Sequence, residues 1–162
     1  MSHPEAAVET LYQIEQLLPH ARPMILLDRV VERLTDGIVT ELKIRPGLPF
    51  FRPMRGIPAH IALEWMAQSC GAHVGASALE SGQPVRVGFL LGTRDFISRV
   101  DWFTEGQIAR VSARLIFHED ETAVFDCHVS CGGDIVITAQ LTVYEPSDIA
   151  TMLASQGIRS GQ

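Results

Sequence analysis

The amino-acid sequence predicts an α+β domain in which one long central helix is wrapped by a curled antiparallel sheet. Residues 58–79 form a helical segment that is apolar almost all round, which is typical of a helix buried in a core. Four strand-like runs follow it and are joined by tight turns, so neighbouring strands must be antiparallel. A sheet that encloses one helix is the economical way to cover such a helix on every side.

Ahead of the central helix, the sequence predicts a short helix and a hairpin. Residues 8–18 place apolar side chains at helical spacing, and Pro19 ends that helix. Residues 24–33 and 38–44 are strand-like, and the turn signal Asp36–Gly37 lies between them. Residues 46–58 contain four prolines and two glycines and are therefore expected to form a shaped loop.

The central helix is expected to begin near Pro58, because proline fits the first turn of a helix. Ser81–Gly82 ends it. Pro146 is expected to begin a short C-terminal amphipathic helix after the last strand. Between these two points Glu119–Asp120 and Gly132–Gly133 are turn signals that separate the last three strands. The four strands are predicted at residues 85–99, 107–118, 121–132 and 134–145.

Composition is consistent with one acidic globular domain over residues 1–162, with loose ends at 1–7 and 157–162. The net charge of −6 argues against binding along a nucleic-acid backbone. The first ten residues do not resemble a signal peptide, and the apolar stretches are too short or too interrupted to cross a membrane. Three cysteines without paired spacing indicate a reducing compartment. We therefore expect a cytoplasmic protein that binds neither nucleic acid nor membrane.

Glu64 is the candidate catalytic residue, because it lies in the middle of the helix that is expected to be buried. An unpaired carboxylate is costly in a core, and one shielded from water is suited to general acid or base chemistry. The alternatives are a carboxylate on a solvated stripe of the helix, or one paired with an arginine for structure. His60 and Gln68 lie four residues to either side and share its helix face, which suggests a cleft or a dimer seam.

His60 is also near the helix start, where free amides bind an anion or a polarised carbonyl. The alternative is an exposed histidine at the mouth of the loop. We expect no metal and no cofactor, since Cys127 and Cys131 share a strand face without the spacing of a zinc site. The motifs of serine hydrolases, dinucleotide-binding enzymes and phosphate-loop proteins are absent, which disfavours those reactions.

Three segments of the chain resemble the 3-hydroxyacyl-[acyl-carrier-protein] dehydratases, and they occur in the same order. Residues 17–30, LLPHARPMILLDRV, resemble the opening motif of that family. Residues 64–68, EWMAQ, resemble its Glu-Ala-Met-Ala-Gln, and residues 88–96, GFLLGTRDF, resemble the strand that follows. This strand and the Ile57–Pro58–Ala59 entry are most similar to the aryl-polyene-pathway branch. The resemblance implies a hotdog fold, dimerisation through paired sheets and an acyl thioester substrate.

The resemblance also implies residue roles. In the family, a helix glutamate acts with a loop histidine contributed by the other subunit, and helix-start amides polarise the thioester carbonyl. Glu64 matches that glutamate, and Ala59 takes the place of the glycine whose amide polarises the thioester carbonyl. The family's Gly-His-Phe-Pro block is missing after Pro49–Phe50–Phe51, so the loop histidine has no counterpart. His60 is the candidate to replace it.

Three functions follow as alternatives: a 3-hydroxyacyl-ACP dehydratase, which is a hydro-lyase; a hotdog acyl thioesterase; or a non-catalytic hotdog subunit that pairs with an active dehydratase. The expected partners are an acyl carrier protein or CoA thioester, and a second subunit in a homodimer or heterodimer. Phe51 and Gln68 are expected to contact the substrate. Arg52, Arg55 and Arg94 are expected to contact the acidic carrier or its phosphate, and the alternative for these arginines is ordinary surface charge.

Overall fold

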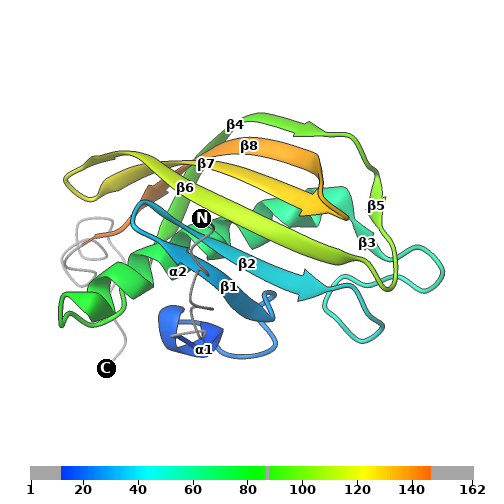
Figure 1. Ribbon diagram of the computed structural model, residues 1–162, viewed down its shortest axis with the longest axis horizontal. Coiled ribbons are helices and arrows are strands. Elements are labelled where there is room, and N and C mark those ends of the chain that lie inside the picture. Colours follow the sequence, from blue (N-terminus) through cyan, green and yellow to red (C-terminus); the bar gives the residue numbers. More distant parts are fainter. Residues whose placement is uncertain (1–11, 87, 147–162) are drawn as a thin grey trace, which may run out of the picture.

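The fold is given by a computed structural model that describes residues 12–86 and 88–146. A one-turn helix, α1 (Ile14–Leu17), comes first, and β3 (Ile57–Pro58) leads through the 3₁₀ turn η1 (Ala59–Ile61) into the long helix α2 (Ala62–Glu80) (Figure 1). The remaining elements are strands: β1 (Arg29–Leu34), β2 (Gly37–Lys43), β4 (Phe89–Ser98), β5 (Trp102–Phe103), β6 (Ile108–Glu119), β7 (Thr122–Cys131) and β8 (Asp134–Tyr144).

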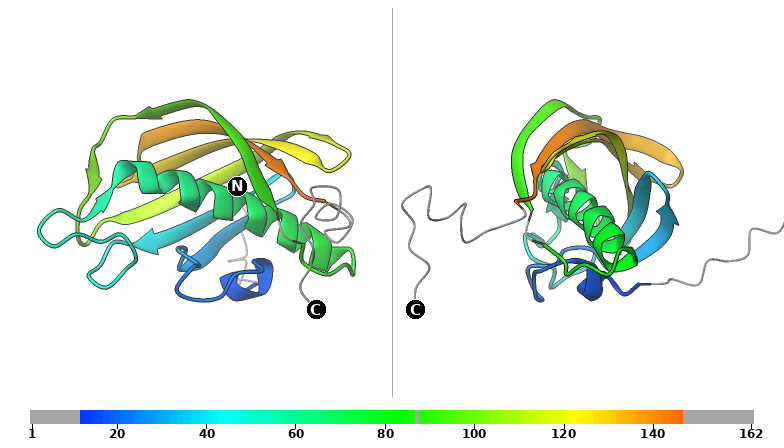
Figure 2. Two further views of the ribbon diagram at one scale, coloured as in Figure 1. Left: turned by 180° about the vertical axis from the view of Figure 1, so that it is seen from behind. Right: turned by 90° about the vertical axis from the view of Figure 1, so that its left-hand side faces the viewer.

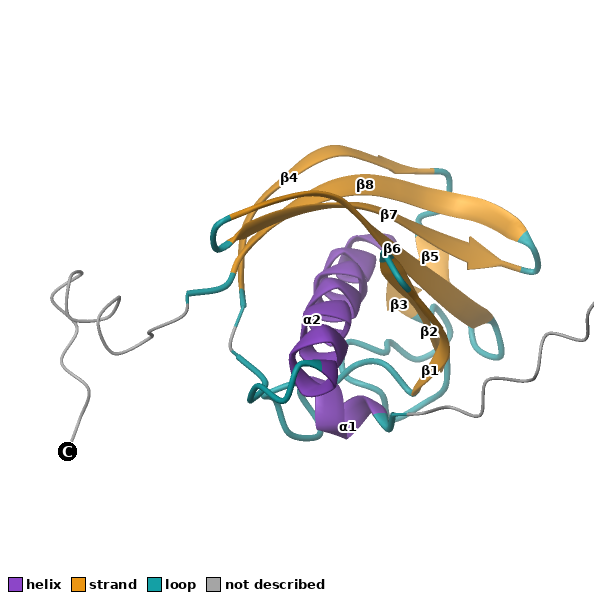
Figure 3. Cartoon of the chain, turned by 60° about the vertical axis from the view of Figure 1, so that its left-hand side comes forward, coloured by secondary structure: helices purple, strands orange, loops and turns teal. Residues whose placement is uncertain are grey.

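Six of the strands form one antiparallel sheet in the order β1-β2-β6-β7-β8-β4. The sheet curls around α2, which lies along its concave side (Figures 2 and 3). The short strands β3 and β5 pair separately at the start of α2. This arrangement is the hotdog fold, so the predicted fold class is confirmed.

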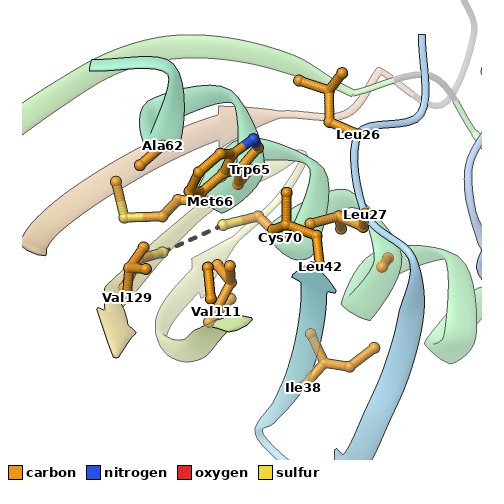
Figure 4. Close-up of a cluster of buried hydrophobic side chains, with 14 of the residues drawn as sticks. Leu26, Leu27, Ile38, Leu42, Ala62, Trp65, Met66, Cys70, Val111 and Val129 are labelled. Carbon is orange, nitrogen blue, oxygen red and sulfur yellow. Dashed lines mark hydrogen bonds between the residues drawn. The ribbon is translucent and has the colours of Figure 1, made fainter. Parts of the chain in front are cut away.

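Apolar side chains of α2 form the centre of the core. Trp65, Met66 and Cys70 are at most 1% exposed, and they pack towards Val111 and Val129 on the sheet (Figure 4). Burying one side chain of this size contributes roughly 2 kcal/mol to folding. The core therefore holds α2 against the sheet along one side of the helix.

Gly75 explains how α1 approaches α2. A Cβ atom at Gly75 would lie 2.1 Å from the backbone oxygen of Leu17, so any side chain there would push the two helices apart. At Gly71 the nearest atom to such a Cβ is a methyl carbon of Leu18, at 3.2 Å. The segment around α1 therefore approaches α2 closely at both glycines.

The hairpin turns lie where they were predicted. Gly132 and Gly133 have φ angles of 59° and 87° between β7 and β8. Two successive positive φ angles match the right-handed twist of the strands and strongly favour glycine. The pairing of β7 with β8 therefore follows from local turn chemistry.

Two predicted segments differ from the structure. Residues 24–28 are not in the sheet, and β1 begins only at Arg29. The side chain of Gln68 takes the place of a neighbouring strand there, because it bonds the backbone of both Met24 and Leu26. In addition, β4 begins at Phe89 rather than residue 85, and β5 was not predicted.

The ends of the chain are described only in part. The helix predicted at residues 8–18 is described from residue 12, and there it is the single turn α1. The helix predicted after Pro146 and the loose ends predicted at 1–7 and 157–162 lie outside the described residues.

Candidate active site

A groove of about 140 Å³ lies between α2 and the first part of β4. Glu64 and Gln68 line it from α2, and His20 lines it from the segment after α1. Leu90 of β4 and Val143 of β8 form part of its apolar wall. Four separate parts of the chain therefore line one groove that contains a carboxylate.

The Glu64 side chain is exposed in the single chain, so the prediction that it is buried is wrong for the isolated subunit. The helix is apolar almost all round, but the sheet does not cover the face that carries Glu64. One carboxylate oxygen, Oε1, accepts a hydrogen bond from Nε2 of Gln68 at 3.2 Å. This bond limits where the carboxylate lies, while the groove leaves it accessible to a bound molecule.

Gln68 is 4% exposed, and its amide connects two parts of the groove. Its Oε1 accepts a hydrogen bond from the backbone N–H of Leu26 at 2.8 Å. Its Nε2 donates to the backbone oxygen of Met24 at 2.8 Å as well as to Glu64. Each of these bonds satisfies a polar group that would be costly to leave unpaired in the interior. Gln68 therefore holds both the 24–26 segment and the Glu64 carboxylate.

The start of the helix carries the two other residues that the sequence pointed to. His60 is exposed in η1, one turn before Glu64, and it is not among the residues that line the groove. Ala59 is buried, and its amide donates to the backbone oxygen of Asp101 at 2.9 Å. In the single chain this amide therefore extends the β3–β5 pair. The family resemblance, by contrast, implies that it faces a thioester carbonyl.

His20 is a groove residue that the sequence analysis did not select. It is exposed, and it stands on the same groove as Glu64 because Gln68 fastens the following 24–26 segment to α2. The sequence signal for it was the Leu17–His20 stretch, which belongs to the motif that resembles the dehydratases. No local pattern indicates that this loop packs against a helix that begins about forty residues later in the chain.

Two of the predicted arginines share one aromatic ring. The guanidinium carbons of Arg52 and Arg55 lie 5.8 and 5.5 Å from the centre of the Trp102 ring, within the range of cation–π contacts. Phe51 is half-buried and packs against the core, whereas Arg94 is exposed on β4 opposite Gln140. The structure thus brings Arg52 and Arg55 together in the loop before α2, whereas Arg94 belongs to β4.

A second polar cluster lies in the other half of α2, around His73. This side chain is 3% exposed, and its Nδ1 accepts a hydrogen bond from Nη1 of Arg33 at 2.6 Å. Burial, followed by the nearby positive charge of Arg33, lowers the pKa of His73 to about 4. His73 is therefore neutral near pH 7 and packed in place.

The described part of the chain shows no group of three or more His, Cys, Asp or Glu side chains that could hold a metal ion. Among these same residues, no helix is long and apolar enough to cross a membrane. Glu64 is the one carboxylate among the residues that line the groove.

Sequence comparisons find dehydratases among the proteins that this chain resembles. Residues 12–154 match the family model described as ApeP-like, ApeP dehydratase. The 3-hydroxyacyl-[acyl-carrier-protein] dehydratase FabZ of Streptococcus equi subsp. zooepidemicus is 28% identical over 134 residues, which cover 80% of this chain and 93% of that protein.

Among the solved structures, a dehydratase is again more similar to this chain than a thioesterase is. The dehydratase heterocomplex ApeI:P from Xenorhabdus doucetiae aligns with a TM-score of 0.82 at 26% identity, covering 89% of this chain and 97% of that one. A hypothetical thioesterase from Streptococcus pneumoniae, solved with coenzyme A, aligns with a TM-score of 0.58 at 12% identity, covering 73% and 84% of the two chains. The second likeness shows the fold alone.

Proposed function

The chain belongs to the ApeP-like dehydratase family, and from that premise we propose that it is a 3-hydroxyacyl thioester dehydratase subunit that supplies Glu64 as an acid/base. The observation that carries the proposal is the Glu64–Gln68 hydrogen bond at the wall of an apolar groove. The carboxylate is held by a buried amide on one side and is open to the groove on the other. A group that exchanges a proton with a bound substrate needs both properties.

The reaction removes water from a 3-hydroxyacyl thioester. A base takes a proton from C2, the C2–C3 double bond forms, and the C3–O bond breaks. An acid gives a proton to the departing hydroxyl, so the products are water and a 2-enoyl thioester. Glu64 serves one of these two proton transfers, and a second group is needed for the other.

Within the chain, His60 is the proposed second group. It lies one helical turn before Glu64 and is exposed, so it can reach a thioester at the helix start. His20 is the in-chain alternative, because it lines the groove with Glu64. Replacing each histidine separately with asparagine distinguishes them, because only the acid/base should lower turnover by orders of magnitude while substrate affinity is kept.

The second candidate function is a subunit that pairs with a different hotdog protein carrying the loop histidine. The structure of ApeI:P is a dehydratase heterocomplex, and it supports this candidate. Among the strands that the structure describes, β4 lies at an edge of the sheet, and this supports the candidate as well, since Leu91 and Ile97 there are each 60% exposed. An exposed apolar edge strand is a surface for pairing with another strand. We propose pairing through β4, with a second copy or with such a relative, next to the groove.

The carrier is proposed to dock at the loop before α2. Arg52 and Arg55 flank Trp102 there, and Met54 between them is fully exposed. Cations beside an apolar side chain suit an acidic protein surface and the phosphate of a pantetheine arm. Arg94 on β4 is proposed as a further contact, and Phe51 as part of the wall that the arm passes.

The test is turnover of a 3-hydroxyacyl carrier protein by the purified chain, alone and mixed with a hotdog relative that has the loop histidine. We expect the 2-enoyl product in at least one of the two reactions, and Glu64→Gln should abolish it. Glu105→Gln, a matched change in an exposed turn, should leave turnover unchanged. If neither reaction gives product, the dehydratase proposal fails.

The same reactions test the thioesterase alternative. A thioesterase would release free thiol and a carboxylic acid from acyl-CoA, and the release would depend on Glu64. Thiol release without 2-enoyl product would overturn the dehydratase proposal in its favour.

A further inference from the structure

A second and larger cavity, of about 350 Å³, lies between the last two turns of α2 and the hairpin of β6 and β7. We call it the helix-end cavity. The hairpin tip and the end of α2 lie at the same end of the molecule (Figures 1 and 2). The floor of the cavity is mainly apolar and includes Val74 and Ala78 of α2, Leu115 of β6 and Phe125 of β7. Such a floor is more stable when it is covered than when it contacts water.

The last strand, β8, leads the chain to the rim of this cavity. Glu145 directly follows β8 and lines the cavity. Its backbone N–H donates to the backbone oxygen of Glu121 at 2.8 Å, which holds it against the turn before β7. Pro146 is buried, and residues 147–162 follow it outside the part of the chain that the structure describes. Ile149, three residues further on, is therefore within about 11 Å of Pro146.

The segment after Pro146 has an apolar face that extends over one helical turn. Ile149, Met152 and Leu153 are spaced i, i+3 and i+4, which places them on one side of a helix. Thr151 belongs to the opposite side. A helix this short is not stable alone in water, so it needs an apolar surface to fold against. The floor of the helix-end cavity is such a surface, and the chain leaves the sheet at its rim.

The charges at the rim favour an uncharged occupant. The ionisable side chains other than His73 that line the cavity are Arg86, His118, Asp120, Glu121 and Glu145. Burial raises the pKa of the Glu145 carboxyl group, which shows that it lies in a poorly hydrated place. A phosphate group or an acidic protein surface would meet like charge at the three carboxylates. Residues 149–158, in contrast, contain no charged side chain.

We propose that residues 147–158 fold back over the helix-end cavity of the same chain and place Ile149, Met152 and Leu153 on its floor. The inference does not depend on the proposed function. It has a consequence for the groove, because Arg86 and Val143 line both openings. The docked segment supports the wall that the helix-end cavity shares with the Glu64 groove.

The experiment cross-links the segment to the cavity floor in the full chain. Ala78→Cys is combined with Met152→Cys in a Cys131→Ser background, which removes the cysteine that is not fully buried. The matched control combines Ala78→Cys with Thr151→Cys, which has nearly the same tether but belongs to the opposite helix side. We expect mild oxidation to form the intramolecular disulfide at least about tenfold faster with Met152→Cys, since docking raises the effective concentration of that thiol.

Equal rates for the two pairs would overturn the proposal. Mixing a chain that carries only Ala78→Cys with one that carries only Met152→Cys tests for exchange between copies. Cross-linked dimers that form as fast as the intramolecular disulfide would overturn the proposal in favour of a segment from a second copy. Val74→Cys, one turn earlier on the same floor, replaces Ala78→Cys if that variant does not fold.

Maleimide labelling of Ala78→Cys is a second measurement. Leu153→Asp should raise the labelling rate at least about tenfold, because the rate follows the population in which the segment has left the floor. Ser155→Asp, on the other side of the predicted helix, should leave the rate unchanged. A rate that does not respond to Leu153→Asp would overturn the proposal too. The dehydratase proposal stands or falls separately, by the presence or absence of Glu64-dependent product.

Discussion

The two halves of α2 use polar residues in opposite ways. In the first half Glu64 is exposed and has one hydrogen-bonding neighbour, Gln68. In the second half His73 is almost fully buried, and Arg33 holds it in place. A side chain that exchanges protons with a ligand must be reachable, whereas a buried polar group must be satisfied by the protein itself. One helix meets both requirements because its two halves are covered by different parts of the chain.

Arg33 of β1 is the residue that makes the second half rigid. Its Nη1 donates to His73 and to the backbone oxygens of Leu34 and Gly37, at 2.6, 2.7 and 3.0 Å. Its Nη2 donates to Oγ of Ser77 at 2.9 Å. No such cluster surrounds Glu64 in the part of the chain that the structure describes. The comparison therefore predicts that changes in the first half alter activity and that changes in the second half alter stability.

The largest effect is expected from two variants, one in each half of α2, that should separate loss of activity from loss of stability. Glu64→Gln should lower turnover by about 10²–10⁴-fold, the usual contribution of a general acid or base. Its free energy of unfolding should change by no more than about 0.5 kcal/mol, because the side chain is exposed. His73→Gln should do the reverse. Turnover assays and urea denaturation of both variants measure this, and equal loss of stability in the two would break the comparison.

The pH dependence of stability is the next largest effect. His73 has a pKa of about 4 in the folded protein, below its ordinary value of 6.5, so the unfolded chain binds the proton more readily. Stability from this residue is complete above pH 6.5 and is lost as the pH falls towards 4, by on the order of 2–3 kcal/mol. Denaturation curves between pH 4 and 7 measure the loss. In His73→Gln the slope should be smaller, and an unchanged slope would assign it to other groups.

Gln68→Met joins the two halves of the comparison, because Gln68 is buried yet contacts Glu64. The change keeps the volume but leaves the backbone groups of Met24 and Leu26 without their partner. We expect a loss of about 1–3 kcal/mol in stability and lower turnover with it. Thermal unfolding and kcat measure the two effects. If stability falls and kcat does not, the Gln68–Glu64 bond is only structural.

The smallest effect is expected outside α2, at the carrier-docking loop. Reversing charge in Arg52→Glu with Arg55→Glu should raise KM for the carrier substrate by about 3–10-fold with little change in kcat, since exposed charges contribute modestly. The increase should shrink at high salt. Arg110→Glu with Arg114→Glu, at exposed positions of β6, is the matched double charge reversal outside the loop. A KM that does not respond would remove both arginines from the docking surface.

The buried helix, the antiparallel hairpins and the family motifs were all predictable from the sequence alone, because each depends on residues close together in the chain. The apolar run of α2 and the Gly132–Gly133 turn are local signals of this kind. The sequence also singled out Glu64, since a carboxylate inside an apolar run is conspicuous wherever the run ends up.

Only the tertiary structure decided which face of α2 remains uncovered. The sheet covers one side of the helix, and the segment after α1 is fastened to another by Gln68, so Glu64 lies exposed at the gap and His20 beside it. The same packing placed the Arg33 side chain against His73 and left a cavity of about 350 Å³ between the end of α2 and the hairpin of β6 and β7. These outcomes depend on contacts between residues some forty positions apart, and the period of a helix carries no information about them.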